Sequence, residues 1–128
     1  MIILDSDIVI WILRDKRELI SWLESYREKE SIGVSTITIA EVYQNIRSNE
    51  YDKVKLFFSK QEKIPVSVNI AEQGGLYWNQ YHTKYLKMGI TDCLIAATAS
   101  LTDHKLYTLN TRHFPMADIK VLNPLKKI

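Results

Sequence analysis

The sequence has few of the features of an exported or membrane-bound protein. Cys93 is its only cysteine, so no intramolecular disulfide can form, and this suits a reducing cytoplasm. No segment approaches the roughly 18–20 consecutive apolar residues that a transmembrane helix needs. We therefore expect a cytoplasmic protein that does not enter the membrane.

Neither the overall charge nor a phosphate-binding motif identifies a ligand. The 17 basic and 15 acidic residues give a net charge of only +2, which is too small to indicate a nucleic-acid-binding protein through its overall field. The patterns GxGxxG and GxxxxGK[ST] are both absent, which argues against a nucleotide-binding α/β domain. Any functional signal must come from the positions of individual residues.

Strand and helix patterns alternate along the 128 residues, which we expect to form a single domain, 1–128. Short apolar runs predict strands at 2–4, 32–34, 64–68, 106–108 and 119–122. Helical periodicity predicts helices at 6–13, 16–27, 37–47, 51–59, about 70–85 and 91–101. The alternation is typical of a three-layer α/β/α domain around a mainly parallel sheet of four to five strands. Gly74 and Gly75, inside the longest helical stripe, indicate a close packing contact.

Polar side chains stand where several of these strands end or helices begin. Asp5 follows the first strand, Asp92 precedes an apolar helix, and Asn110 lies beyond the strand that ends at Thr108. Each has an ordinary structural explanation, because an aspartate caps helices or interacts with their dipole and an asparagine is a common turn residue. Glu41 lies opposite the apolar stripe of its helix, which is typical of a solvated helical face.

The combination of these residues also suits metal chemistry. The carboxyl ends of parallel strands meet at one edge of a sheet, so Asp5, Asp92 and Asn110 should lie on that edge. Clustered carboxylates repel one another unless a counter-charge is present, and Mg²⁺ and Mn²⁺ prefer oxygen ligands. Such a cation could activate a water molecule for phosphodiester hydrolysis. At this point the structural explanations and the metal-site hypothesis both stay open.

Four segments resemble, in order and spacing, the motifs of the PIN-domain family. Residues 3–13, ILDSDIVIWIL, resemble its first motif, in which a buried strand ends in an aspartate followed by Ser or Thr. Residues 34–44, VSTITIAEVYQ, resemble the second, with a glutamate one turn into a helix, and residues 89–100, GITDCLIAATAS, are very similar to the third. Residues 106–114, LYTLNTRHF, resemble the fourth. The resemblance covers essentially the whole chain, and the chain's length is that of VapC-like toxins.

The resemblance implies a role for each matching residue. Asp5, Glu41 and Asp92 would bind Mg²⁺ or Mn²⁺ and organise the attacking water. Asn110 takes the fourth catalytic position, where many relatives have an aspartate; because it is neutral, one metal would be held firmly and a second only with substrate. Hydrolysis would leave a 5′-phosphate and a 3′-hydroxyl. Two further residues are expected as second-layer or water-mediated partners: Asp7 and Thr108.

The resemblance also implies a biological role, that of an endoribonuclease toxin of a type II toxin–antitoxin pair. A cognate VapB-like antitoxin would block the acidic site, and operator DNA would be contacted only through the antitoxin. A PIN nuclease of RNA processing and a non-catalytic RNA-binding PIN scaffold stay open as alternatives. A phosphoacceptor receiver domain is disfavoured, because residues 64–70, IPVSVNI, offer no aspartate after the third strand.

Some further side chains support weaker expectations. The aromatic stripe of Tyr77, Trp78, Tyr81 and Tyr85 is typical of a core or an interface, and its size indicates a homodimer or a partner surface. Arg112 and His113 lie near the proposed cleft, where they could contact a phosphate or a helix end. Cys93 is expected as a packed apolar residue rather than a nucleophile.

Overall fold

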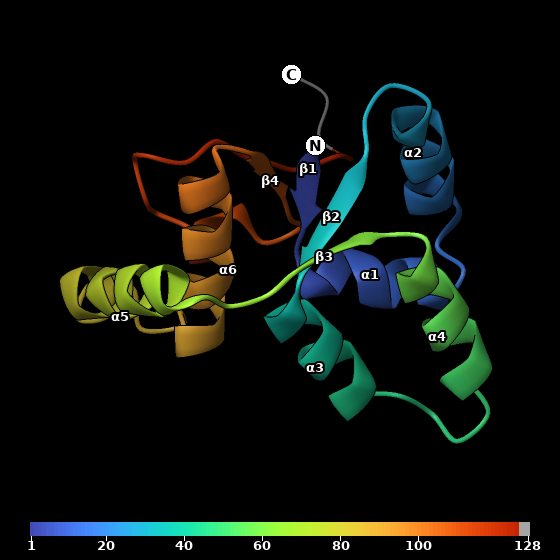
Figure 1. Ribbon diagram of the computed structural model, residues 1–128, viewed down its shortest axis with the longest axis horizontal. Helices are drawn as coiled ribbons and strands as arrows, with labels where there is room; N and C mark the ends of the chain where they lie inside the picture. The colour runs from blue at the N-terminus through green and yellow to red at the C-terminus, as the bar shows by residue number, and fades with distance from the viewer. Residues whose placement is uncertain (126–128) are drawn as a thin grey trace.

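A parallel five-stranded sheet forms the centre of the protein in this computed structural model, which describes residues 1–125 (Figure 1). The sheet order is β3-β2-β1-β4-β5, and all four strand pairings are parallel. The strands are β1 (Ile2–Leu4), β2 (Ile32–Ser35), β3 (Glu62–Ile64), β4 (Lys105–Tyr107) and β5 (Val121–Leu122). The helices are α1 (Ser6–Leu13), α2 (Arg17–Arg27), α3 (Thr36–Gln44), α4 (Tyr51–Ser59), α5 (Val68–Tyr81) and α6 (Ile90–Thr102), with a 3₁₀ turn, η1 (Thr111–His113).

Two apolar clusters cover the two faces of the sheet. In β1, Ile2 and Leu4 join one cluster while Ile3 joins the other, because successive strand residues point to opposite faces. The first cluster packs beneath α1 to α4 and the second beneath α5 and α6, which lie on opposite sides of the sheet in Figure 1. The predicted three-layer α/β/α fold with a parallel sheet is confirmed.

The strand order places a switch point beside the central strand. From β1 the chain moves to β2 and β3 on one side, and it then returns through α5 and α6 to β4 on the other side. Leu4 pairs with Tyr107, and the Asp5 amide donates to the Tyr107 carbonyl at 2.9 Å. Residues that follow β1 and β4 therefore lie side by side at the carboxyl edge, where ligands bind in such sheets.

Several predicted element boundaries were wrong. The third strand covers 62–64 rather than 64–68, because Pro65 has no amide proton for the ladder and Ser67 already caps α5, its hydroxyl accepting from the Ile70 amide at 3.2 Å. Helix α5 ends at Tyr81, so Tyr85 lies in the segment beyond it. The last strand covers 121–122 rather than 119–122. The other elements lie within three residues of their predicted ends.

The contact between α5 and α6 explains one of the two glycines in the long stripe. A Cβ atom at Gly74 would lie 2.6 Å from Cδ2 of Leu94, whereas a Cβ atom at Gly75 would meet nothing within 4 Å. The predicted close packing contact is confirmed for Gly74 alone. The aromatic stripe also divides, since Tyr77 is buried and Trp78 is partly exposed and stacked on His82. The homodimer stays a prediction.

Cys93 is buried in α6, as expected of a packed apolar residue. Within residues 1–125, no helix is long and apolar enough to cross a membrane.

Candidate active site

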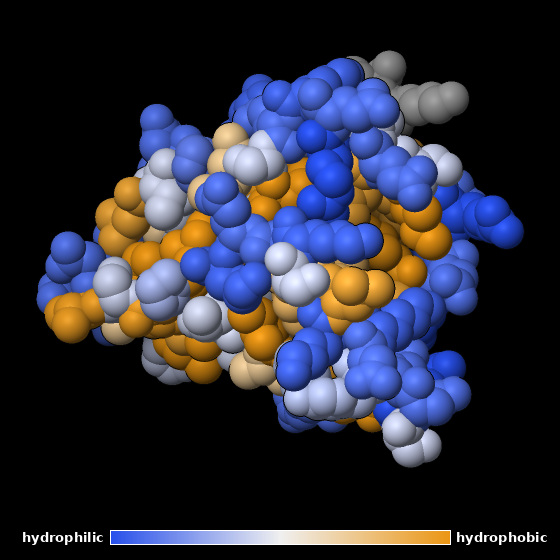
Figure 2. Space-filling view, turned by 45° about the vertical axis from the view of Figure 1, so that its right-hand side comes forward, coloured by the Kyte–Doolittle hydropathy of each residue, from blue (hydrophilic) through white to orange (hydrophobic). Residues whose placement is uncertain are grey.

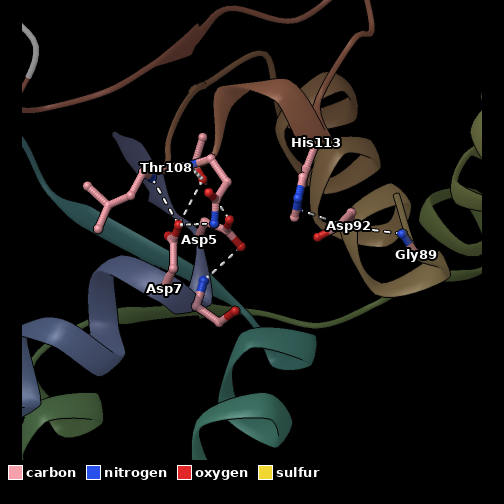
Figure 3. Close-up of polar contacts among 9 residues, drawn as sticks. Asp5, Asp7, Gly89, Asp92, Thr108 and His113 are labelled. Carbon is pink, nitrogen blue, oxygen red and sulfur yellow. Dashed lines mark hydrogen bonds and ion pairs between the residues drawn. The ribbon is translucent and has the colours of Figure 1, made fainter. Parts of the chain in front are cut away.

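Asp5 lies where the central strand β1 passes into α1, and it is only 5% exposed. As the N-cap of α1 it accepts a hydrogen bond from the Ser6 amide at 2.8 Å. Its second carboxylate oxygen accepts a hydrogen bond from the Thr108 hydroxyl, also at 2.8 Å (Figure 3). Burial, reinforced by the neighbouring carboxylate of Asp7, raises the pKa of Asp5 to about 8. The helix cap and the candidate ligand are therefore the same side chain.

Asp7 joins the first turn of α1 to the loop that follows β4. Its Oδ1 accepts from the Ile8 amide at 2.7 Å, and its Oδ2 accepts from the Leu109 amide at 3.0 Å and from Nδ2 of Asn110 at 3.2 Å. Burial raises the pKa of Asp7, and the hydrogen bonds from the Leu109 and Ile8 amides partly oppose the rise. Asn110 thus serves as a hydrogen-bond donor to a carboxylate, which an ionised aspartate could not do.

Thr108 connects the two carboxylates of this corner. It is fully buried, its hydroxyl oxygen lies 2.8 Å from Asp5 and 3.3 Å from Asp7, and it also accepts from the Asn110 amide at 3.0 Å. A hydroxyl carries one proton and donates to one carboxylate at a time, and the shorter distance favours Asp5. Thr108 therefore orients Asp5, while its expected role as a second-layer partner stays a prediction.

Asp92 stands in the first turn of α6, at the same edge of the sheet as Asp5 (Figure 3). One of its oxygens accepts from the Gly89 amide at 3.0 Å and lies 3.7 Å from Nδ1 of His113. Burial raises the pKa of Asp92, and the Gly89 amide and His113 counteract this. The charge of Asp92 in turn contributes to the raised pKa of Asp5, so the two carboxylates lie close enough to repel one another.

Glu41 is less closely integrated than the three aspartates. It is half-buried on α3, which packs against α1 and α6, and within residues 1–125 its carboxylate has no hydrogen-bond or ion-pair partner. Three residues earlier on the same helix, Thr38 is fully buried and its hydroxyl also has no partner among these residues. Residues three apart share a helix face. Thr38 was not predicted from the sequence, although its spacing from Glu41 indicates that the two residues share a helix face.

The chemistry of this donor set fits a divalent cation. The pKa values of Asp5, Asp7 and Asp92 are all raised by burial, and within residues 1–125 no lysine or arginine forms an ion pair with any of them. In the same part of the chain, no three His, Cys, Asp or Glu side chains lie close enough to hold a metal ion together. Asp5, Glu41 and Asp92 are therefore not gathered as one compact triad. Such a donor set suits Mg²⁺, which keeps several waters beside one or two carboxylates.

The sequence of the chain matches the model of a known protein family. The profile of the PIN domain matches residues 2–120, nearly the whole length that carries the sheet and the acidic edge. The chain belongs to the PIN-domain family.

Individual PIN-domain relatives resemble the chain over most of its length. It is 34% identical over 116 residues to Ribonuclease VapC10 of Mycobacterium tuberculosis, covering 91% of this chain and 87% of the relative. Among solved structures, a toxin–antitoxin complex from Klebsiella pneumoniae matches with a TM-score of 0.81 and 26% identity, covering 99% of this chain and 100% of that one. VapBC2 from Rickettsia felis, bound to a promoter DNA fragment, matches with a TM-score of 0.83 and 25% identity, covering 96% and 98%.

The polar residues of the first, third and fourth PIN-domain motifs converge at one edge of the sheet. Asp5, Asp7, Thr108 and Asn110 form one hydrogen-bonded corner, and Asp92 with His113 lies beside it. Glu41 belongs to the adjacent helix and joins neither group. The catalytic and metal-binding roles of these residues stay predictions.

Proposed function

We propose that this PIN-domain chain is the ribonuclease toxin of a type II toxin–antitoxin pair, and that it hydrolyses RNA phosphodiester bonds with Mg²⁺ or Mn²⁺. The observation that carries the proposal is the cluster of raised-pKa carboxylates at the carboxyl edge of the sheet, held by helix amides and by Thr108. The family relation to VapC ribonucleases supports the RNA-cleaving activity.

The chain's own residues would hold and orient the reactants. Asp5 and Asp92 would hold the cation from two sides of the edge, and Glu41 would approach from α3. A divalent cation supplies an activated water molecule and offsets charge on the scissile phosphate. Thr108 fixes the rotamer of Asp5 through its 2.8 Å hydrogen bond, and Asn110 holds Asp7 through its amide. These contacts keep the ligands in position before substrate arrives.

Two alternative PIN functions give different expectations. A nuclease of RNA processing would use the same site without toxicity, whereas a non-catalytic scaffold would have no use for the carboxylates. The scaffold is disfavoured because the charged form of Asp5, whose pKa burial raises to about 8, lowers the stability of the folded chain, whereas a neutral N-cap residue would hold α1 without this cost. The toxin role is favoured by the similarity to VapC10 and to the Klebsiella pneumoniae toxin–antitoxin complex.

An exposed apolar groove supports a VapB-like antitoxin as the protein partner. Its volume is about 300 Å³, and Figure 2 shows apolar surface between polar side chains on the side of α2 and α4. Leu56, at its rim, is 59% exposed. The apolar lining consists of Ile12, Leu13, Ile20, Leu23, Leu56 and Phe57. An exposed apolar patch of this kind commonly marks a protein–protein contact.

The ribonuclease is tested by incubating purified chain with total RNA in Mg²⁺ or in EDTA, and by inducing it in growing cells. We expect discrete cleavage with 5′-phosphate ends only with the cation, and arrest of growth. Asp92→Asn should abolish both, because it removes a ligand charge, while Asp52→Asn on the exposed face of α4 should change neither. A folded wild-type chain that neither cuts RNA nor stops growth would overturn the proposal.

The antitoxin is tested separately, by co-expressing the chain with the product of a neighbouring small reading frame. Leu56→Asp should weaken the complex because it places a charge in the apolar groove. It should leave RNA cleavage unchanged because none of the candidate site residues lines this groove. If the Leu56→Asp variant binds the antitoxin as tightly as the wild type does, the groove is not part of the antitoxin-binding surface.

A further inference from the structure

We propose that a cavity beside the acidic edge binds one unpaired nucleotide of the RNA substrate, next to the phosphodiester bond that is cut, and that Lys87 and Arg112 hold its phosphate. The inference rests on the proposed ribonuclease function for its place in the reaction. It adds two RNA-binding residues to the proposed site, of which Lys87 lies outside the four segments that resemble PIN motifs.

The cavity lies between two connecting segments. It has a volume of about 540 Å³ and is lined by residues 85–88, which join α5 to α6, and by residues 109–113, which follow β4. This volume is within the roughly 300–1,000 Å³ that small-ligand sites occupy. A single nucleotide fits a concave site of this size, whereas a base within a duplex would have to leave its stack to enter it.

The cavity shares its wall with the acidic cluster. Asn110 lines it and donates to Asp7 at 3.2 Å, and His113 lines it while its Nδ1 lies 3.7 Å from Asp92. The segment 85–88 also runs directly into Gly89, whose amide donates to Asp92. An occupant of the cavity would therefore contact Asn110 and His113, which directly neighbour Asp7 and Asp92, rather than a remote surface.

The charge of the lining complements RNA. No carboxylate lines the cavity, and its cations Lys87 and Arg112 are exposed and have no hydrogen-bond or ion-pair partner within residues 1–125. The adjacent carboxylates of Asp5, Asp7 and Asp92 repel phosphates, so the attraction for a polyanion at this edge must come from neighbouring cations. Contacts from lysine and arginine to phosphates position a nucleic acid without reading its sequence.

The remaining lining residues offer contacts for a base. Tyr85 is half-buried beyond the end of α5 and is held edge-on to Tyr81, with ring centroids 6.2 Å apart, while Leu86 is 86% exposed. Aromatic and apolar side chains of this kind stack on bases that have been freed from pairing. The combination of phosphate-binding cations with an apolar wall favours an unpaired nucleotide over a duplex backbone.

The test compares two double variants of the full chain that carry the same change in charge. Lys87→Ala/Arg112→Ala removes both cations of the cavity, and Lys29→Ala/Lys120→Ala removes two exposed lysines that precede β2 and β5 at the opposite edge of the sheet. Binding of a fluorescent single-stranded RNA of about ten nucleotides is measured by anisotropy in Ca²⁺, over a range of salt concentrations. Cleavage of the same RNA is measured separately in Mg²⁺.

We expect the cavity variant to bind single-stranded RNA on the order of tenfold or more weakly than the control variant. When log affinity is plotted against log salt concentration, the slope for the cavity variant should be less steep than that for the control variant. The difference should be about 0.7 for each phosphate that the cavity variant no longer binds. A duplex of the same sequence should bind weakly and equally to both variants. If the wild type binds through the cavity cations but does not cut RNA, the nucleotide site stands and the ribonuclease proposal fails.

Three outcomes would overturn the nucleotide site. They are single-stranded RNA binding that is equal in the two double variants, a duplex that binds as tightly as the single strand with the same sensitivity to the cavity substitutions, and a wild-type chain that does not bind single-stranded RNA. The first of these, found together with metal-dependent cleavage by the wild type, would leave the ribonuclease proposal intact.

Discussion

The buried carboxylate of Asp5 makes the stability of the fold depend on pH. Its pKa rises from an ordinary 3.8 to about 8, chiefly because burial disfavours the charged form. Between these values the folded chain keeps a proton that the unfolded chain has lost. The contribution to stability is therefore fully present below about pH 3.8 and is lost as the pH rises toward 8. At about 1.4 kcal/mol per pH unit, the loss amounts to roughly 2 kcal/mol at pH 5 and roughly 5 kcal/mol at pH 8.

Asp5→Asn removes this charge while keeping most of the hydrogen bonds. Its side-chain oxygen can still accept from the Ser6 amide, and its NH₂ group can donate to Thr108, whose hydroxyl can then donate to Asp7 at 3.3 Å. The loss of a charged acceptor costs about 1–2 kcal/mol. We expect the variant to match the wild type near pH 5 and to exceed it by about 3 kcal/mol at pH 8, without RNA cleavage.

The measurement is urea unfolding in EDTA at several pH values, with Asp52→Asn as the exposed control. The free energy of unfolding of the wild type should fall from pH 5 to pH 8 relative to the Asp5→Asn variant. The control should follow the wild type to within about 1 kcal/mol. Added Mg²⁺ should stabilise the wild type at pH 8 and leave the variant unchanged, because a ligand that binds only the folded state raises its stability. If the free energies of unfolding of the wild type and of Asp5→Asn change in parallel with pH, the buried charge of Asp5 does not lower the stability of the fold.

Four further substitutions test the surroundings of the site and the helix contact. Thr108→Val removes the hydrogen bond that lowers the pKa of Asp5, so the Mg²⁺ concentration for half-maximal cleavage should rise at pH 7 and recover at higher pH; an unchanged pH profile would contradict this. Asn110→Asp replaces a donor by another carboxylate, so unfolding in EDTA should show a loss of about 1–3 kcal/mol that Mg²⁺ reverses. Gly74→Ala should destabilise by about 1–3 kcal/mol, because its Cβ would lie 2.6 Å from a packed side chain, whereas Gly75→Ala should gain up to about 1 kcal/mol; equal effects on urea unfolding would exclude the close contact.

The sequence was sufficient to predict the layers of the fold because its short apolar runs and helical stripes have distinct periods. It was insufficient for the end of α5, because the aromatic stripe continues to Tyr85 although the helix stops at Tyr81. The third strand was misplaced for a local reason, since apolar residues around Pro65 look like a strand but belong to the connection that ends at the Ser67 cap. Periodicity identifies faces, whereas the ends of elements depend on caps and individual hydrogen bonds.

Some residues of the candidate site could be located from the sequence, whereas their contacts with distant residues could not. Asp5 and Asp92 follow from rules about strand and helix ends, which depend on nearby sequence. The partner of Asn110 does not, because its contact with Asp7 joins residues 103 positions apart and appears only when β4 pairs with β1. The unpartnered hydroxyl of Thr38 is likewise a property of tertiary packing.

The sequence left a helix-capping role and a metal-binding role open for the aspartates, and the structure shows that the two roles are compatible. Asp5, Asp7 and Asp92 each accept a hydrogen bond from an amide at the start of α1 or α6. Helix N-terminal amides carry partial positive charge, so they stabilise carboxylates that repel one another and that burial disfavours. The amides oppose the rise in the pKa values without cancelling it. The amides at the starts of α1 and α6 therefore offset part of the cost of burying the three carboxylates. A divalent cation would neutralise the negative charge that these amides leave.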